Sequence, residues 1–344
     1  MPSANRGLPD RHNKPVVIDL NAAIVRVADG SPEILAVRPS GAKDEDPAVW
    51  DALPFGPFDP LKHRTMEIGL RSWVQEQTQL SLGYVEQLYT FGDRGRHAQE
   101  VLDEIEHIVS VGYLALTRGG EERDGVFWRS WYQYFPWEDW RDGKPAIIDR
   151  VIMPLLTDWA ARKPDPTSDE LSRGRRADRV RFIFGSDDGN WDEETVLERH
   201  ELLYEAGLVR EAARDGRSNA IALGRANDPQ LGLPMQHDHR RILATAMSRL
   251  RAKLKYRPVV FELMDDTFTL YELQRTGEAL LGLHVHKQNF RRLVEKAGLV
   301  EKTGRMSTRT GGRPAELFRF RREVFSERPA PGLKLAPTRT RANT

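Results

Sequence analysis

The chain is 344 residues long, which favours about two domains, and its 39% of hydrophobic residues exclude a wholly disordered protein. It contains no cysteine, so disulfides, thiol nucleophiles, iron–sulfur clusters and cysteine zinc sites are excluded. No apolar run reaches the roughly 18 residues of a membrane span, and the N-terminus has no apolar signal core. We therefore expect a soluble, cytoplasmic protein without a membrane partner.

Charge is distributed unevenly along the chain. Residues 236–344 contain 23 Lys and Arg against 11 Asp and Glu, whereas residues 1–235 contain 29 against 40. A basic C-terminal part joined to an acidic body indicates an anionic partner for the basic part. A salt-bridged interface between the two halves explains the same charges, and composition leaves both interpretations open.

Strand and helix patterns alternate in the N-terminal half, between polar ends at residues 1–14 and 328–344 that predict disordered tails. Runs rich in β-branched residues predict strands at 16–27, 34–37, 84–89 and 107–116. An amphipathic helix is predicted over 62–77 by apolar residues at helical spacing, namely Met66, Leu70, Trp73 and Val74. The first domain is therefore predicted to be mixed α/β.

The middle of the chain contains an aromatic-rich segment. Residues 127–140 (FWRSWYQYFPWEDW) hold eight aromatic side chains, which indicates core or subunit-interface packing rather than stacking on a base. Farther along, the run at 179–184 predicts a strand. Asn190 and Glu193 then form a capping-box signal, which predicts the start of a helix.

Beyond a linker predicted at 227–235, three helices and a hairpin follow. Apolar periodicity marks the first helix between Ile242 and Leu254, and Thr269 with Glu272 opens the second through a T-x-x-E cap. The remaining predicted elements are a third helix that ends at Gly298, strands at 299–303 and 315–320, and a Gly- and Arg-rich loop at 304–314 between these strands. This is the order of a winged helix-turn-helix domain, assigned to residues 236–327.

The third helix of this domain has a cationic outer face. With Phe290 and Val294 turned inward, the residues expected to contact DNA are Lys287, Gln288, Asn289, Arg291 and Arg292, joined by Arg305, Arg309 and Arg313 on the hairpin. Gln288 and Arg291 can make bidentate contacts with base edges, whereas the hairpin arginines suit phosphates. A protein-interaction module with a solvated basic face is the alternative interpretation.

Residues 53–80 (LPFGPFDPLKHRTMEIGLRSWVQEQTQL) resemble a degenerate Nudix box, whose pattern is Gly-x5-Glu-x7-Arg-Glu-U-x-Glu-Glu-x-Gly-U with U a bulky aliphatic residue. Glu76 matches the first glutamate of the pair, but Gln77 replaces the second and Trp73 replaces the glutamate after the arginine. Arg64 stands where the upstream glutamate belongs. Because Nudix hydrolysis needs several carboxylates to hold Mg²⁺ or Mn²⁺, this chain is expected to be no enzyme and to bind no metal.

The box, the segment YVEQLYTFGDRGR at 84–96 and C-terminal motifs such as NFRR at 289–292 together resemble the Nudix-related transcriptional regulators of NAD metabolism. The resemblance implies an α/β (α+β) Nudix-like nucleotide-sensing domain over 15–235, followed by the winged helix. It does not extend over about 141–235, which we treat as an uncharacterised insertion.

The resemblance further implies a homodimeric repressor of NAD biosynthesis or salvage genes. It would bind operator DNA and respond to an adenine nucleotide, namely NAD, ADP-ribose or ATP, without a required cofactor. In place of metal, the ligand's phosphates would meet Arg38, Arg64, Arg94 and Arg96. Glu76 is a further expected ligand-binding residue. An active Nudix-type pyrophosphatase with a nucleic-acid-binding tail and an adaptor for an acidic partner are the alternatives.

Overall fold

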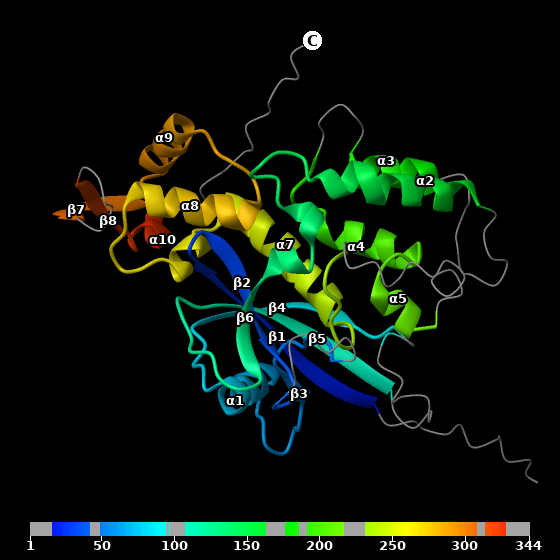
Figure 1. The fold of residues 1–344 in the computed structure, drawn as a ribbon. Helices are drawn as coiled ribbons and strands as arrows, with labels where there is room; N and C mark the ends of the chain where they lie inside the picture. The colour runs from blue at the N-terminus through cyan, green and yellow to red at the C-terminus, as the bar shows by residue number, and fades with distance from the viewer. Residues whose placement is uncertain are drawn as a thin grey trace, which may run out of the picture.

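The computed structural model describes residues 16–41, 49–93, 96, 107–162, 176–185, 191–216, 231–307 and 314–327. The predicted tails at 1–14 and 328–344 lie outside these residues. Within them, a mixed β-sheet is covered by a helix on one face and by a larger helical layer on the other, and a small domain of helices and a hairpin adjoins that layer (Figure 1). No described helix is long and apolar enough to cross a membrane.

A mixed sheet of six strands organises the N-terminal half. Its strands are β1 (Val16–Ala28), β2 (Ser31–Val37), β3 (Phe55–Pro57), β4 (Tyr84–Phe91), β5 (His107–Leu116) and β6 (Val126–Ser130). The order across the sheet is β4-β5-β1-β2-β6, with β3 paired to β1; β1 and β5 run parallel, and the other pairs are antiparallel. All four predicted strands of this half are confirmed.

One helix, α1 (Met66–Thr78), covers one face of the sheet. Leu70 and Val74 are buried in the same apolar cluster as residues of β1 and β5. The helix begins four residues later than predicted, because the side chain of Thr65 accepts a hydrogen bond from the Ile68 amide and so forms the N-cap. The predicted periodicity is confirmed, and the predicted start at residue 62 is wrong.

The long helix α7 (His239–Tyr256) covers the opposite face and lies against β1, β4 and β5 (Figure 1). It approaches β5 so closely that a Cβ on Gly112 would lie 2.9 Å from Ile242. The aromatic segment leaves β6 through two short 3-10 turns, η2 (Trp131–Gln133) and η3 (Pro136–Glu138), and enters the same core. Its most buried rings have no exposed surface, namely Trp131, Tyr134, Phe135 and Trp137. Core packing of this segment is confirmed.

The described parts of residues 141–235 form a helical layer beside α7 (Figure 1). Its described elements are the π-helix η4 (Ile148–Ile152), α2 (Met153–Ala161), α3 (Arg176–Phe184), α4 (Val196–Glu205) and α5 (Arg210–Arg214). The strand predicted at 179–184 is wrong, because Val180 and Phe184 are buried together one helical turn apart. The predicted helix start is also misplaced: Thr195 is the N-cap of α4, and Asn190 lies outside the described residues.

The C-terminal elements follow the predicted order. After α7 come the 3-10 helix η7 (Val259–Leu263), α8 (Leu270–Leu281), α9 (Lys287–Ala297), the hairpin β7 (Val300–Ser307) and β8 (Ala315–Phe320), and the short α10 (Val324–Glu327). Both bonds of the capping box between Thr269 and Glu272 are present, and Gly298 ends α9 with a φ of 59°. The predicted start of the loop at 304 is wrong, since β7 continues to Ser307 through an irregularity in its pairing.

Candidate ligand pocket and nucleic-acid interface

A pocket of about 380 Å³ opens between the sheet and the C-terminal end of α1. Its lining residues come from the end of β2, from the approach to β6 and from α1, and include Val37, Arg38, Ser40, Phe55, Gln77, Asp124, Val126 and Gln236. The pocket therefore lies beside the box helix, in the domain for which the resemblance implies a nucleotide ligand. Of the four predicted ligand-binding residues that the structure describes, Arg38 alone lines it.

The box helix is fastened to β3 by the two residues that replace carboxylates in the Nudix pattern. The side-chain amide of Gln77 donates to the Phe55 carbonyl at 2.5 Å and accepts from the Phe55 amide at 3.2 Å. The indole of Trp73 donates to Pro57 at 2.9 Å, and it lies so close to Gly56 that a Cβ there would be 2.4 Å from the ring. Both side chains therefore act as structural contacts of β3, and neither supplies a charge for a cation.

Arg38 is held in the pocket wall by a buried carboxylate. Its guanidinium pairs with Asp51, which is 1% exposed, and Asp51 also meets Arg129 at 3.1 Å. The Tyr134 hydroxyl donates a further hydrogen bond to Asp51. Burial and the neighbouring Asp51 carboxylate hold the pKa of Tyr134 well above its usual value, so the hydroxyl keeps the proton that it donates.

The expected cluster of ligand-binding residues is not assembled. Arg64 and Glu76 are exposed on the α1 side of the sheet and do not line the pocket. Arg96 is drawn to the opposite, α4 side, where its guanidinium pairs with Glu201 at 2.8 Å and lies 4.0 Å from the centre of the Tyr204 ring. Arg94 lies outside the described residues. The sheet separates these side chains, a separation that sequence spacing does not reveal.

Sequence reasoning also missed several pocket residues. The sequence indicates Gln77 only as the replacement of a glutamate and Gln236 only as a residue at the domain boundary, yet both line the pocket. Asp124 accepts hydrogen bonds from the Ser40 hydroxyl and the Gly41 amide, and so links two loops at the pocket rim. No local pattern marks these residues, because the loops meet only in the fold. Among the described residues, no group of three or more His, Asp or Glu side chains could hold a metal ion.

The predicted DNA-contacting face of α9 is exposed. Phe290 and Val294 are buried, and the five predicted residues of the helix, Lys287, Gln288, Asn289, Arg291 and Arg292, all face solvent. Within the described residues, Lys287 and Arg291 have no ion-pair partner. Arg305 is exposed on β7, whereas Arg309 and Arg313 lie outside the described residues. An exposed helix with unneutralised cations, followed by a basic hairpin, has the charge and shape of a groove-binding element.

Comparison with known proteins supports this assignment of the C-terminal domain. Residues 260–320 match the NrtR DNA-binding winged helix domain. The ADPR responsive transcriptional repressor NtrR of Acinetobacter baylyi is 41% identical over 90 residues, which are 26% of this chain and 36% of that protein. The match therefore spans about a third of the relative's length.

Solved structures match over most of the chain. The crystal structure of Shewanella oneidensis NrtR complexed with a 27mer DNA matches with a TM-score of 0.51 and 20% identity, covering 90% of this chain and 95% of that one. A second crystal structure of Shewanella oneidensis NrtR matches with the same TM-score and the same identity, covering 90% of this chain and 96% of that one. The chain thus contains an NrtR-type winged helix at residues 260–320 and has the NrtR fold over most of its length.

Proposed function

We propose that this protein is a transcriptional repressor that binds operator DNA through α9 and the β7–β8 hairpin. The observation that carries the proposal is the exposed cationic face of α9 within a winged helix of the NrtR type. Lys287 and Arg292 bind phosphates beside the groove, and Gln288 and Arg291 read base edges. Asn289 lies on the same exposed face, and Arg305, Arg309 and Arg313 contact phosphates from the hairpin.

The pocket beside α1 is our candidate for the effector site. Its Arg38 offers a guanidinium to a diphosphate, and its apolar wall, which includes Val37 and Phe55, suits a ring. The relative from Acinetobacter baylyi is described as responsive to ADPR, which favours ADP-ribose over NAD and ATP. We place this site in a sensing domain of residues 15–235, with Gln236, the first residue of the proposed DNA-binding domain (236–327), also lining it, and we require no cofactor for either domain.

Binding without turnover follows from the contacts of the box helix. Gln77 and Trp73 occupy two carboxylate positions of the Nudix pattern and are engaged with β3, and Glu76 is exposed outside the pocket. Among the residues that the structure describes, no group of carboxylates is placed to hold Mg²⁺. Incubation with ADP-ribose and Mg²⁺ tests this: we expect no AMP, and its steady release would favour the pyrophosphatase.

We further propose that the protein acts as a homodimer in the cytoplasm on genes of NAD biosynthesis or salvage. One winged helix contacts a single half-site, and two half-sites raise both affinity and specificity. The target genes follow from the resemblance to regulators of NAD metabolism.

Selection from a random-sequence DNA library tests the central proposal. The protein is expected to enrich a duplex with a repeated half-site, and saturating ADP-ribose is expected to change the affinity for that duplex. A variant with Arg291→Ala should enrich a motif that has lost its base preference at one position, whereas Arg181→Ala, which removes an exposed arginine from α3, serves as the matched control. Failure of the unmodified protein to enrich any motif would contradict the proposal.

A further inference from the structure

The segment after β6, residues 131–141, touches the wall of the ligand pocket at its beginning. The hydroxyl of Tyr134 donates to Asp51, the carboxylate that holds Arg38 in the pocket wall. Tyr134 has no exposed surface, and its carbonyl accepts a hydrogen bond from Arg240 of α7 at 2.5 Å. Tyr134 is therefore held from both sides, and a change at Asp51 acts directly on it.

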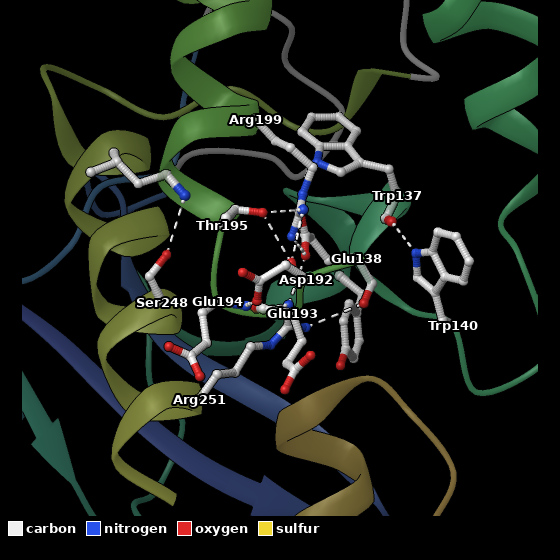
Figure 2. A network of polar contacts seen from close by, with 12 residues as sticks. Trp137, Glu138, Trp140, Asp192, Glu193, Glu194, Thr195, Arg199, Ser248 and Arg251 are labelled. Atoms are coloured by element: carbon white, nitrogen blue, oxygen red, sulfur yellow. Dashed lines mark hydrogen bonds and ion pairs between the residues drawn. The ribbon is translucent and has the colours of Figure 1, made fainter. Parts of the chain in front are cut away.

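Farther along, the same segment carries a fully buried carboxylate. Figure 2 shows Glu138 between two arginines from different helices. Arg199 of α4 donates to it at 2.6 and 2.9 Å, and Arg251 of α7 donates at 2.7 Å. All three side chains are 0% exposed. Because both guanidiniums depend on the single Glu138 carboxylate, a displacement of this carboxylate would break ion pairs in the interior, and its position is therefore strictly determined.

The segment ends on the C-terminal turn of α8. Arg251 also donates to the Leu280 carbonyl at 3.0 Å, and the Tyr132 hydroxyl donates to the Ala279 carbonyl at 2.7 Å. The Trp140 amide donates to the Gly282 carbonyl at 2.7 Å. Gly282 fits so tightly that a Cβ there would lie 2.3 Å from the Glu138 carbonyl. Because α9 begins five residues after Gly282, a shift of this turn reorients the DNA-binding helix.

A phosphate in the pocket would compete with Asp51 for Arg38. Asp51 is buried, so water cannot replace Arg38 as its partner. The Asp51 carboxylate would then depend on its remaining partners, Arg129 and Tyr134. The core around Tyr134 is close-packed, and close-packed interiors pass displacements on rather than absorb them. The next constrained groups along the chain are Glu138 and the α8 contacts.

We propose that residues 131–141 are a coupling segment that transmits occupancy of the pocket to α8 and so to α9. Asp51 and Tyr134 form its input, and Glu138, Arg251 and the last turn of α8 form its output. This inference rests on the proposed function and names how its two sites communicate.

The test separates coupling from binding through a single hydroxyl. Tyr134→Phe keeps the buried ring and removes only the bond to Asp51. The DNA dissociation constant is measured with and without saturating ADP-ribose, on a duplex that the unmodified protein selects. We expect a ratio of about 5–150 in the unmodified protein and below about 3 in Tyr134→Phe. Each variant is expected to bind the duplex alone, and ADP-ribose alone, within about threefold of the unmodified protein.

Tyr204→Phe is the matched control, since it removes another buried hydroxyl that donates to a carboxylate, that of Asp215 at 2.8 Å, within the helical layer. It should retain the full ratio. Tyr132→Phe, which removes the bond to Ala279 at the other end of the segment, should lower the ratio as Tyr134→Phe does. An unchanged ratio in both segment variants, or an equal loss in Tyr204→Phe, would overturn the coupling segment. Absence of ADP-ribose binding or DNA binding in the unmodified protein would instead overturn the proposed function, and the coupling segment with it.

Discussion

The arginines of the interior and those of α9 are the same residue in opposite settings. Arg199, Arg240 and Arg251 are at most 1% exposed, and each is surrounded by carboxylates and main-chain carbonyls from distant segments. Arg291 and Arg292 of α9 face solvent. A guanidinium without acceptors cannot be buried at acceptable cost, so the interior arginines hold the fold together and the exposed ones are available to a polyanion. Charge count therefore identifies a nucleic-acid surface only after burial is known.

The largest effect on stability is expected where buried arginines lose the carboxylate that neutralises them. Glu138→Gln leaves Arg199 and Arg251 buried without a carboxylate, and should lower the free energy of unfolding by roughly 3–5 kcal/mol. Arg199→Met leaves a balanced pair of Glu138 and Arg251 and should cost less. Urea denaturation of both variants measures the difference. An equal loss in the two would show that charge balance is not what this cluster requires.

A second interior charge should make stability depend on pH. Burial raises the pKa of the Asp238 carboxyl to about 6, although Arg241 and Arg96 act in the opposite direction. The folded protein then holds this proton more tightly than the unfolded chain, so Asp238 adds stability below about pH 4 that is lost as the pH rises through 6. Asp238→Asn should remove up to about 3 kcal/mol of this pH dependence.

Denaturation midpoints of Asp238→Asn and of the unmodified protein measure that change at about pH 4 and about pH 8, roughly two units on either side of the expected titration. Asp59→Asn is the control of opposite sign, because the Leu61 amide lowers the pKa of the half-buried Asp59. The same pH response in both variants would contradict the assignment to Asp238.

On the exposed side of the comparison, Arg291→Ala should affect DNA and not stability. Loss of a base-reading arginine is expected to cost about 1–3 kcal/mol of affinity for the selected duplex and to relax specificity at one position. Fluorescence anisotropy with the selected and with substituted duplexes measures both quantities. Unchanged affinity would mean that α9 is not the reading helix.

The smallest effect is expected at the hairpin. Arg305→Ala removes an exposed arginine that we propose contacts a phosphate. It should weaken binding to all sequences alike, lowering the slope of log affinity against log salt by about one. Titrations at several salt concentrations measure the slope. A sequence-dependent loss would move Arg305 from the phosphate-binding to the base-reading group.

Much of the fold was predictable where the signal is local. The cap between Thr269 and Glu272 and the glycine end at Gly298 act between neighbouring residues, and both were correct. The run at 179–184 was misread as a strand, because its helical form depends on the joint burial of Val180 and Phe184 against other helices. In the pocket, Arg38 was predicted from its place after β2, whereas Asp124 and Gln236 arrive from loops with no pattern of their own.

The sequence by itself determined the cationic face of α9, the order of the winged-helix elements and the loss of carboxylates from the box helix, because each depends on residue type at short spacing. Only the tertiary structure decided that Arg96 faces Glu201 rather than the pocket, and that Glu138 joins α4, α7 and α8. The physical reason is the same in both cases. A buried charged side chain lies where other segments supply its hydrogen-bond and ion-pair partners, and those segments are neighbours in space but not in sequence.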